Sequence, residues 1–141
     1  MPIRNVVGSG GSTAAWGGIT GTLANQTDLQ AALTHATPRA ITDTADDLEL
    51  LDAGKTLICN KATAQEVTIP LHSAIALANN AQIVAFQYGA GVLTITAASG
   101  VDLNGIDGGS VALSAQYKPV YLLQVSEDAW VIWGALDGVV A

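Results

Sequence analysis

From Thr44 onward the chain is a series of short apolar runs separated by turn residues, and this pattern constrains the fold more than any other feature. About eight runs recur with turn signals roughly every 8–12 residues, which is typical of an antiparallel β-sandwich or barrel. No strand–helix–strand alternation favours a parallel sheet. We therefore predict an all-β domain over residues 44–141, an antiparallel β-sandwich or jelly-roll-like barrel.

Two pairs of runs have the spacing of β-hairpins. Residues 82–88 and 92–96 flank the glycines at 89 and 91, where a hairpin turn needs positive φ. Residues 119–125 and 129–133 flank the polar triplet 126–128. The other predicted strands are residues 48–51, 56–59, 66–69 (closed by Pro70), 101–103 and 111–113, the last two flanking a glycine-rich turn at 104–109.

Two different segments precede this domain. Residues 1–24 are rich in glycine and serine and are expected to form an extended arm, in which Trp16 and Ile19 would dock on another surface. Residues 25–43 are predicted to be a short helix and a linker, with Thr27 as the N-cap and Pro38 as the stop. Because so short a helix is marginal alone, its apolar stripe must pack on symmetry mates or on one end of the β domain.

Composition excludes several classes of partner. With 5 Lys and Arg against 12 Asp and Glu, the net charge is −7, so nucleic acid and an anionic membrane surface are not expected to bind. Only 12% of the residues are charged, about half the usual share, which favours self-association. The N-terminus does not resemble a signal peptide, and no apolar run approaches the roughly 20 residues that span a bilayer.

Catalytic and metal-binding patterns are weak. His35 and His72 are isolated from any nucleophile motif, so we expect no enzyme activity and no cofactor. The acidic residues at 43–49 and the oxygen-bearing turn at 102–107 could bind Ca²⁺, but a solvated edge and Asn-Gly turn chemistry explain them better. Cys59 is expected to be a small buried side chain.

Tryptophans 130 and 133 stand three apart in one predicted strand, and therefore on opposite faces. One is expected in the core, and the other exposed or in a subunit interface.

Residues 16–33 resemble a segment that recurs in tail-fibre and related virion proteins of tailed bacteriophages, with the pattern W-G-x-I-T-G-T-L-x-x-Q-T-D-L-Q-x-x-L. Residues 48–136 look, more loosely, like the small β domains that end such fibres, in their turn residues at 52–56, 89–95 and 98–101 and in Trp130-Val-Ile-Trp-Gly134.

The resemblance implies a homotrimeric, non-enzymatic component of a phage virion, made in the host cytoplasm. The short N-terminal region favours a capsid decoration protein or head fibre that binds the major capsid protein. The alternative is a tail-fibre tip that binds the host cell surface through loops 105–109 and 126–128. The residues expected to bind the capsid or to form the trimer interface are Ile3, Val6, Val7, Trp16, Ile19, Leu23, Leu29 and Leu33.

Overall fold

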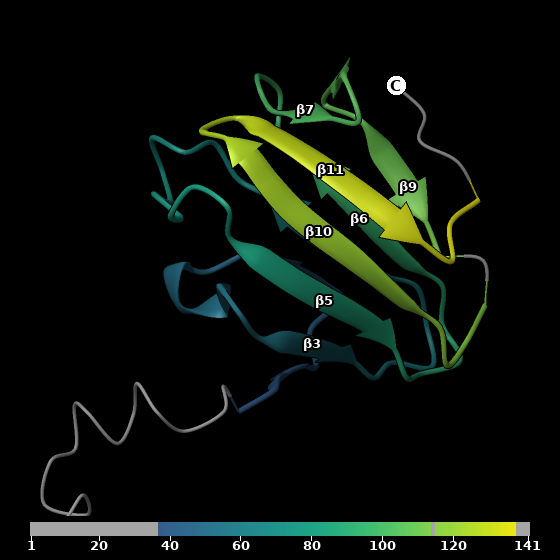
Figure 1. The fold of residues 1–141 in the computed structure, drawn as a ribbon. Helices are drawn as coiled ribbons and strands as arrows, with labels where there is room; N and C mark the ends of the chain where they lie inside the picture. Colours follow the sequence, from purple (N-terminus) through teal and green to yellow (C-terminus); the bar gives the residue numbers. More distant parts are fainter. Residues whose placement is uncertain (1–36, 114, 138–141) are drawn as a thin grey trace, which may run out of the picture. The chain divides into compact units, whose positions relative to one another are not determined.

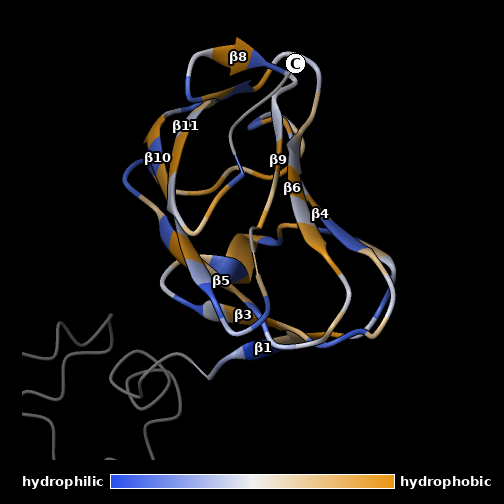
Figure 2. Cartoon of the chain, turned by 90° about the vertical axis from the view of Figure 1, so that its right-hand side faces the viewer, coloured by the Kyte–Doolittle hydropathy of each residue, from blue (hydrophilic) through white to orange (hydrophobic). Residues whose placement is uncertain are grey.

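The computed structural model describes residues 37–113 and 115–137, and they form two β-sheets packed face to face (Figures 1 and 2). Contacts divide the chain into residues 1–35 and 36–141, and both sheets belong to the second unit. Sheet A has the strand order β1-β3-β5-β10-β11-β7-β8, and sheet B the order β2-β4-β6-β9.

The strands of sheet A are β1 (Arg39–Ile41), β3 (Thr56–Cys59), β5 (Gln82–Gln87), β7 (Asp102–Leu103), β8 (Ile106–Asp107), β10 (Pro119–Ser126) and β11 (Ala129–Gly134). Those of sheet B are β2 (Ala45–Asp47), β4 (Gln65–Ile69), β6 (Leu93–Ala97) and β9 (Ser110–Ala112). A 3₁₀ turn, η2 (Leu50–Asp52), follows β2.

The prediction of an all-β sandwich is confirmed, but the prediction that it is antiparallel is wrong for its first half and for the parallel pair of β7 and β11. From β1 to β6 the chain alternates between the sheets, so each strand pairs with the strand two places along, and every such pair is parallel. Leu57 pairs with Ala85 in sheet A and Val67 with Ile95 in sheet B, a separation of 28 residues in both cases. The crossover that parallel strands require is supplied by a strand of the opposite sheet, not by a helix.

Residues 60–64 and 88–92 lead the chain from sheet A to sheet B, and we call these two turns corners. The corners are stacked on one another, which explains why the predicted hairpin at residues 82–96 is wrong. Gly91 N donates to Lys61 O at 2.9 Å, and Gln65 N donates to Val92 O at 2.9 Å. A Cβ on Gly91 would lie 1.8 Å from Thr63 O. The glycine is needed for close approach between two corners, and β5 and β6 lie in different sheets.

Other predicted strands have mixed outcomes. Strands over 56–59 and 66–69 and the hairpin at 119–133 are confirmed as β3, β4 and β10–β11. Residues 48–51 are not a strand: Leu48 is buried, and the capping box between Glu49 and Asp52 starts η2 instead. Segments 101–103 and 111–113 contain strands as predicted, β7 and β9, which lie in different sheets. Sheet A begins with β1, ahead of residue 44, where we expected the domain to start.

The core lies between the two sheets and is almost entirely aliphatic. Its largest fully buried side chains include Leu57, Ile83, Ile95, Leu103 and Leu122, which alternate with outward-facing residues along their strands. Trp130 is 2% exposed and Trp133 is 46% exposed, so the prediction that they occupy opposite faces is confirmed.

Candidate functional site

The outer face of sheet A is the candidate site, because it is apolar although nothing in the described residues covers it. On β3, β5, β10 and β11 every second residue is buried in the core and the residues between them face outward. None of these four strands contains Asp, Glu, Lys or Arg. The outward residues are Thr56, Ile58, Gln82, Val84, Phe86, Pro119, Tyr121, Leu123, Val125, Ala129, Val131 and Trp133.

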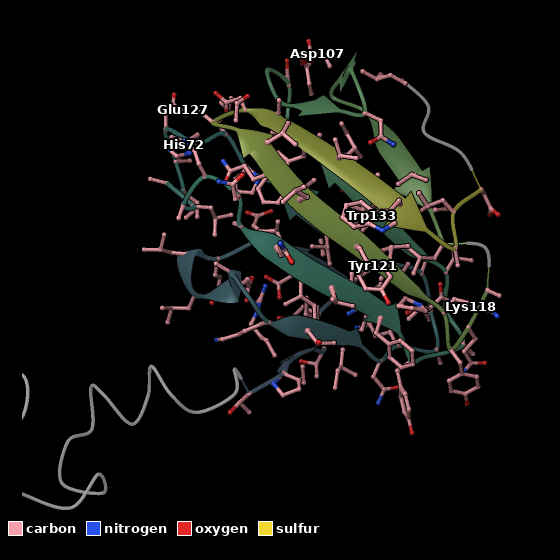
Figure 3. The ribbon with its side chains drawn as sticks, in the orientation of Figure 1. His72, Asp107, Lys118, Tyr121, Glu127 and Trp133 are labelled. Carbon is pink, nitrogen blue, oxygen red and sulfur yellow. The ribbon has the colours of Figure 1, made fainter. Side chains whose placement is uncertain are left out.

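Strand register aligns these side chains in rows across the sheet. Thr56 pairs with Val84, Val84 with Tyr121, and Tyr121 with Trp133, so one row crosses all four strands. The rings of Tyr121 and Trp133 stack at 5.8 Å between centroids with 19° between planes. Figure 3 shows both side chains next to each other on the face turned toward the viewer. The pair forms an aromatic ridge across β10 and β11.

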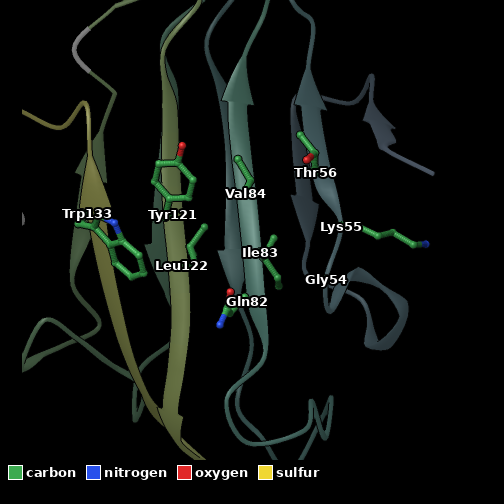
Figure 4. Close-up of a pocket in the computed structure, with 9 residues that line it drawn as sticks. All are labelled: Gly54, Lys55, Thr56, Gln82, Ile83, Val84, Tyr121, Leu122 and Trp133. Atoms are coloured by element: carbon green, nitrogen blue, oxygen red, sulfur yellow. The ribbon is translucent and has the colours of Figure 1, made fainter. Parts of the chain in front are cut away.

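Beside this ridge the face is hollowed by a cavity of about 170 Å³ (Figure 4). Its lining residues include Thr56, Val84 and Gln82, whose side chains are smaller than those of the aromatic pair, and Lys55 at the turn before β3. The lining offers few polar groups and no grouped carboxylates, histidines or thiols. The hollow is therefore suited to an inserted apolar side chain.

Sheet B has an outer face of the opposite character. Thr94 and Thr96 of β6 and Glu66 and Thr68 of β4 face outward between buried residues. Thr96 and Ser110 share a hydrogen bond at 3.1 Å. This is the ordinary alternation of a solvated sheet, so the apolar face of sheet A is not a general property of this chain.

Two of the four acidic residues in the run at 43–49, Asp46 and Glu49, belong to an ion-pair cluster around Arg39. The guanidinium donates to both carboxylate oxygens of the fully buried Asp52 at 2.9 and 2.8 Å, to Asp46 at 2.9 Å and to Glu49 at 3.3 Å. Burial opposes the charge, but the hydrogen bond with Asp52 and the three carboxylates raise the pKa of Arg39 above its ordinary value. The cluster ties β1 to the turn after β2, which is a structural role.

The turn at 102–107 is a hairpin between β7 and β8, with Asn104 and Gly105 both at positive φ. The Asn104 amide donates to Ile132 O at 3.0 Å and accepts from Ile132 N at 2.9 Å, in the manner of a strand partner. Asp107 accepts from Gly100 N. Among the described residues no group of three His, Cys, Asp or Glu side chains is arranged to hold a metal ion.

His72 and Cys59 have structural surroundings. The backbone N–H of His72 donates to Asp128 at 2.7 Å, and its ring lies 3.4 Å from the amide of Gln124, so it joins the 71–80 loop to the β10–β11 hairpin. Cys59 is buried, as predicted, and burial raises the pKa of its thiol to about 12. A thiol protonated in this way is a poor nucleophile at neutral pH.

The eight residues predicted to bind the capsid or form the trimer interface, Ile3, Val6, Val7, Trp16, Ile19, Leu23, Leu29 and Leu33, lie outside the described residues, as does His35. Sequence reasoning identified Trp133 but not the face around it. The face could have been found from the sequence, because the runs that form β5, β10 and β11 have no charged residue at either their inward or their outward positions.

The comparisons with known proteins add no relative: no protein-family model matches this chain, and no curated protein matches it in sequence. In the part of the chain that the structure describes, no helix has the length and apolar character needed to cross a membrane.

Proposed function

We propose that this chain is a structural component of a tailed-phage virion, a homotrimeric capsid decoration protein or short head fibre and not an enzyme. The outer face of sheet A carries the proposal: a broad uncharged surface with exposed Tyr121 and Trp133 is suited to assembly, and the described residues gather no catalytic set beside it. The resemblance of residues 16–33 to virion proteins indicates which kind of assembly.

In this proposal the two parts of the chain have different roles. The N-terminal region, with Trp16, Ile19 and the stripe of Leu29 and Leu33, attaches to the major capsid protein on the capsid exterior. The sandwich is the outward-facing part, and the acidic net charge of −7 keeps the decorated particle soluble.

Co-sedimentation with undecorated capsids, beside whole host cells, tests this function. Saturable pelleting with capsids in multiples of three copies is the expected result. Deletion of residues 1–15 should abolish pelleting while the far-UV spectrum of the β domain is retained. Truncated protein that still decorates capsids would contradict the role of the arm. Pelleting with cells alone would favour the tail-fibre tip.

A further inference from the structure

The strands at the centre of sheet A have the composition of strands covered on both faces. Strands buried on both sides are near-continuous apolar runs, whereas strands with one solvated face alternate with polar residues. Strand β10 contains Val120 and Leu122 toward the core and Tyr121 and Leu123 away from it. The core covers the first pair, and nothing in the described residues covers the second.

The charge distribution identifies a second copy of this chain as the cover. Two chains that each carry −7 repel one another unless the surface between them excludes carboxylates. The part of the outer face of sheet A that β3, β5, β10 and β11 form meets that condition, since these strands contain no acidic residue. Asp102 of β7, which pairs with Ala129, lies at the edge of this part. The outer side of sheet B does not meet the condition, because Glu66 and Asp47 are exposed there. A basic partner, by contrast, would be attracted to sheet B.

The size of the face is sufficient for self-association. The four strands contain four to eight residues each. At a rise of about 3.4 Å per residue and a spacing of about 4.8 Å between strands, they make a face of roughly 20 by 19 Å. Around a threefold axis each such face contacts both of its neighbours, and the three faces together cover roughly 1,100 Å², which is near the area at which specific interfaces begin. The ridge of Tyr121 and Trp133 and the adjacent hollow provide complementary relief.

We propose that the outer face of sheet A is the contact between copies of this chain, with Tyr121, Val131 and Trp133 at its centre. The inference rests on the proposed function in taking the chain to be a homo-oligomer, and it assigns the contact to the sandwich instead of to residues 1–36 alone. It is independent of which surface binds the capsid.

The test is the mass of the full chain by sedimentation equilibrium, for the natural sequence and two matched variants. Val131→Lys places a charge on the outer face of sheet A at a side chain that is already 37% exposed, so the single subunit tolerates it. Thr94→Lys places the same charge mid-strand on the outer face of sheet B, beside Glu66. The unmodified chain is expected at three times 14.3 kDa. Val131→Lys should weaken association at least tenfold, and Thr94→Lys should leave it unchanged.

A second measurement does not depend on whether Val131→Lys and Thr94→Lys fold. Acrylamide quenching of Trp133, taken as the difference between the unmodified chain and Trp133→Phe, reports whether its ring is covered. A trimer with a shielded Trp133 that only Val131→Lys dissociates supports the proposal.

Three results would overturn it. A Val131→Lys protein that is folded and still trimeric would place the contact elsewhere. A monomer with a shielded Trp133 would mean that the chain's own residues 1–36 cover the face, and a monomer with a freely quenched Trp133 would mean that no copy does. Capsid pelleting is scored separately, so a chain that decorates capsids but fails this test retains the proposed function.

Discussion

Replacing Gly91 by alanine tests the stacked corners, on which the alternating path of the chain depends. The added Cβ would lie 1.8 Å from Thr63 O, while real Cβ contacts are not shorter than 3.0 Å. The backbone at Gly91 and the backbone at Thr63 must therefore move apart by more than 1 Å. That movement breaks the hydrogen bonds from Gly91 N to Lys61 O and from Gln65 N to Val92 O, both 2.9 Å. Two such bonds contribute about 2 kcal/mol, and overpacking adds about 1–3 kcal/mol.

The expected loss is therefore about 4 kcal/mol of unfolding free energy. With a urea m-value of about 2 kcal/mol/M, the midpoint should fall by about 2 M. Unfolding followed by circular dichroism at one fixed protein concentration measures this shift, because the stability of an oligomer depends on concentration.

Gly54→Ala is the matched control for the same substitution. Gly54 has φ +78°, but nothing lies within 4 Å of its added Cβ, so only the left-handed conformation penalises alanine. That cost is about 1–2 kcal/mol. A Gly91→Ala protein no less stable than Gly54→Ala would refute the stacked corners and would favour the hairpin that the sequence alone predicts.

Substitutions at three further positions test the Arg39 ion pair, the Asn104 hydrogen bonds and the burial of Cys59. Arg39→Met should lower the free energy of unfolding by about 3 kcal/mol, because it leaves Asp52 buried without its ion pair. Arg39→Lys should recover only part of that loss, since lysine cannot donate to both carboxylate oxygens as the guanidinium does. Urea titration of both variants checks this. Asn104→Ala removes both side-chain hydrogen bonds to Ile132 and should cost about 2 kcal/mol in the same titration. The pKa of the Cys59 thiol is about 12 in the fold against 9.0 as the ordinary value, so its contribution to stability is complete below pH 9 and lost between pH 9 and 12. Between pH 8 and 10 the unmodified chain should therefore lose about 1.4 kcal/mol more than Cys59→Ala, and equal losses would contradict this.

The class of fold and several strands could be predicted from the sequence because they depend on local signals. The 119–133 hairpin follows from two apolar runs around three polar residues, and β4 follows from Val67 and Ile69 before Pro70. The pairing of β3 with β5 could not be predicted in this way. It joins residues 28 positions apart, and the glycines at the corner between β5 and β6 have the same appearance in a hairpin turn and in a stacked corner.

The helical segment and the trimer remain predictions, because the residues on which they depend lie outside those that the structure describes. Within the described part, the residue that organises the acidic run was missed. Arg39 lies before the run in the sequence, and only the folded chain brings it onto the buried Asp52.

The polarity of the outward-facing residues differs between the strands of the two sheets, and it also locates the candidate site. In β4 and β6 the outward positions are Glu66, Thr68, Thr94 and Thr96, which is the alternation expected where one side meets water. In β5, β10 and β11 the outward positions are mostly aromatic or aliphatic, so the inward-facing and the outward-facing residues are both largely apolar. Of these five strands, the two of the first kind lie in sheet B and the three of the second kind lie in sheet A, whereas β7 and β8 of sheet A carry the exposed Asp102 and Asp107. The apolar outward positions also imply that another surface covers this part of sheet A, and the described residues do not supply that surface. The mass of the Val131→Lys protein tests whether a second copy of the chain supplies it.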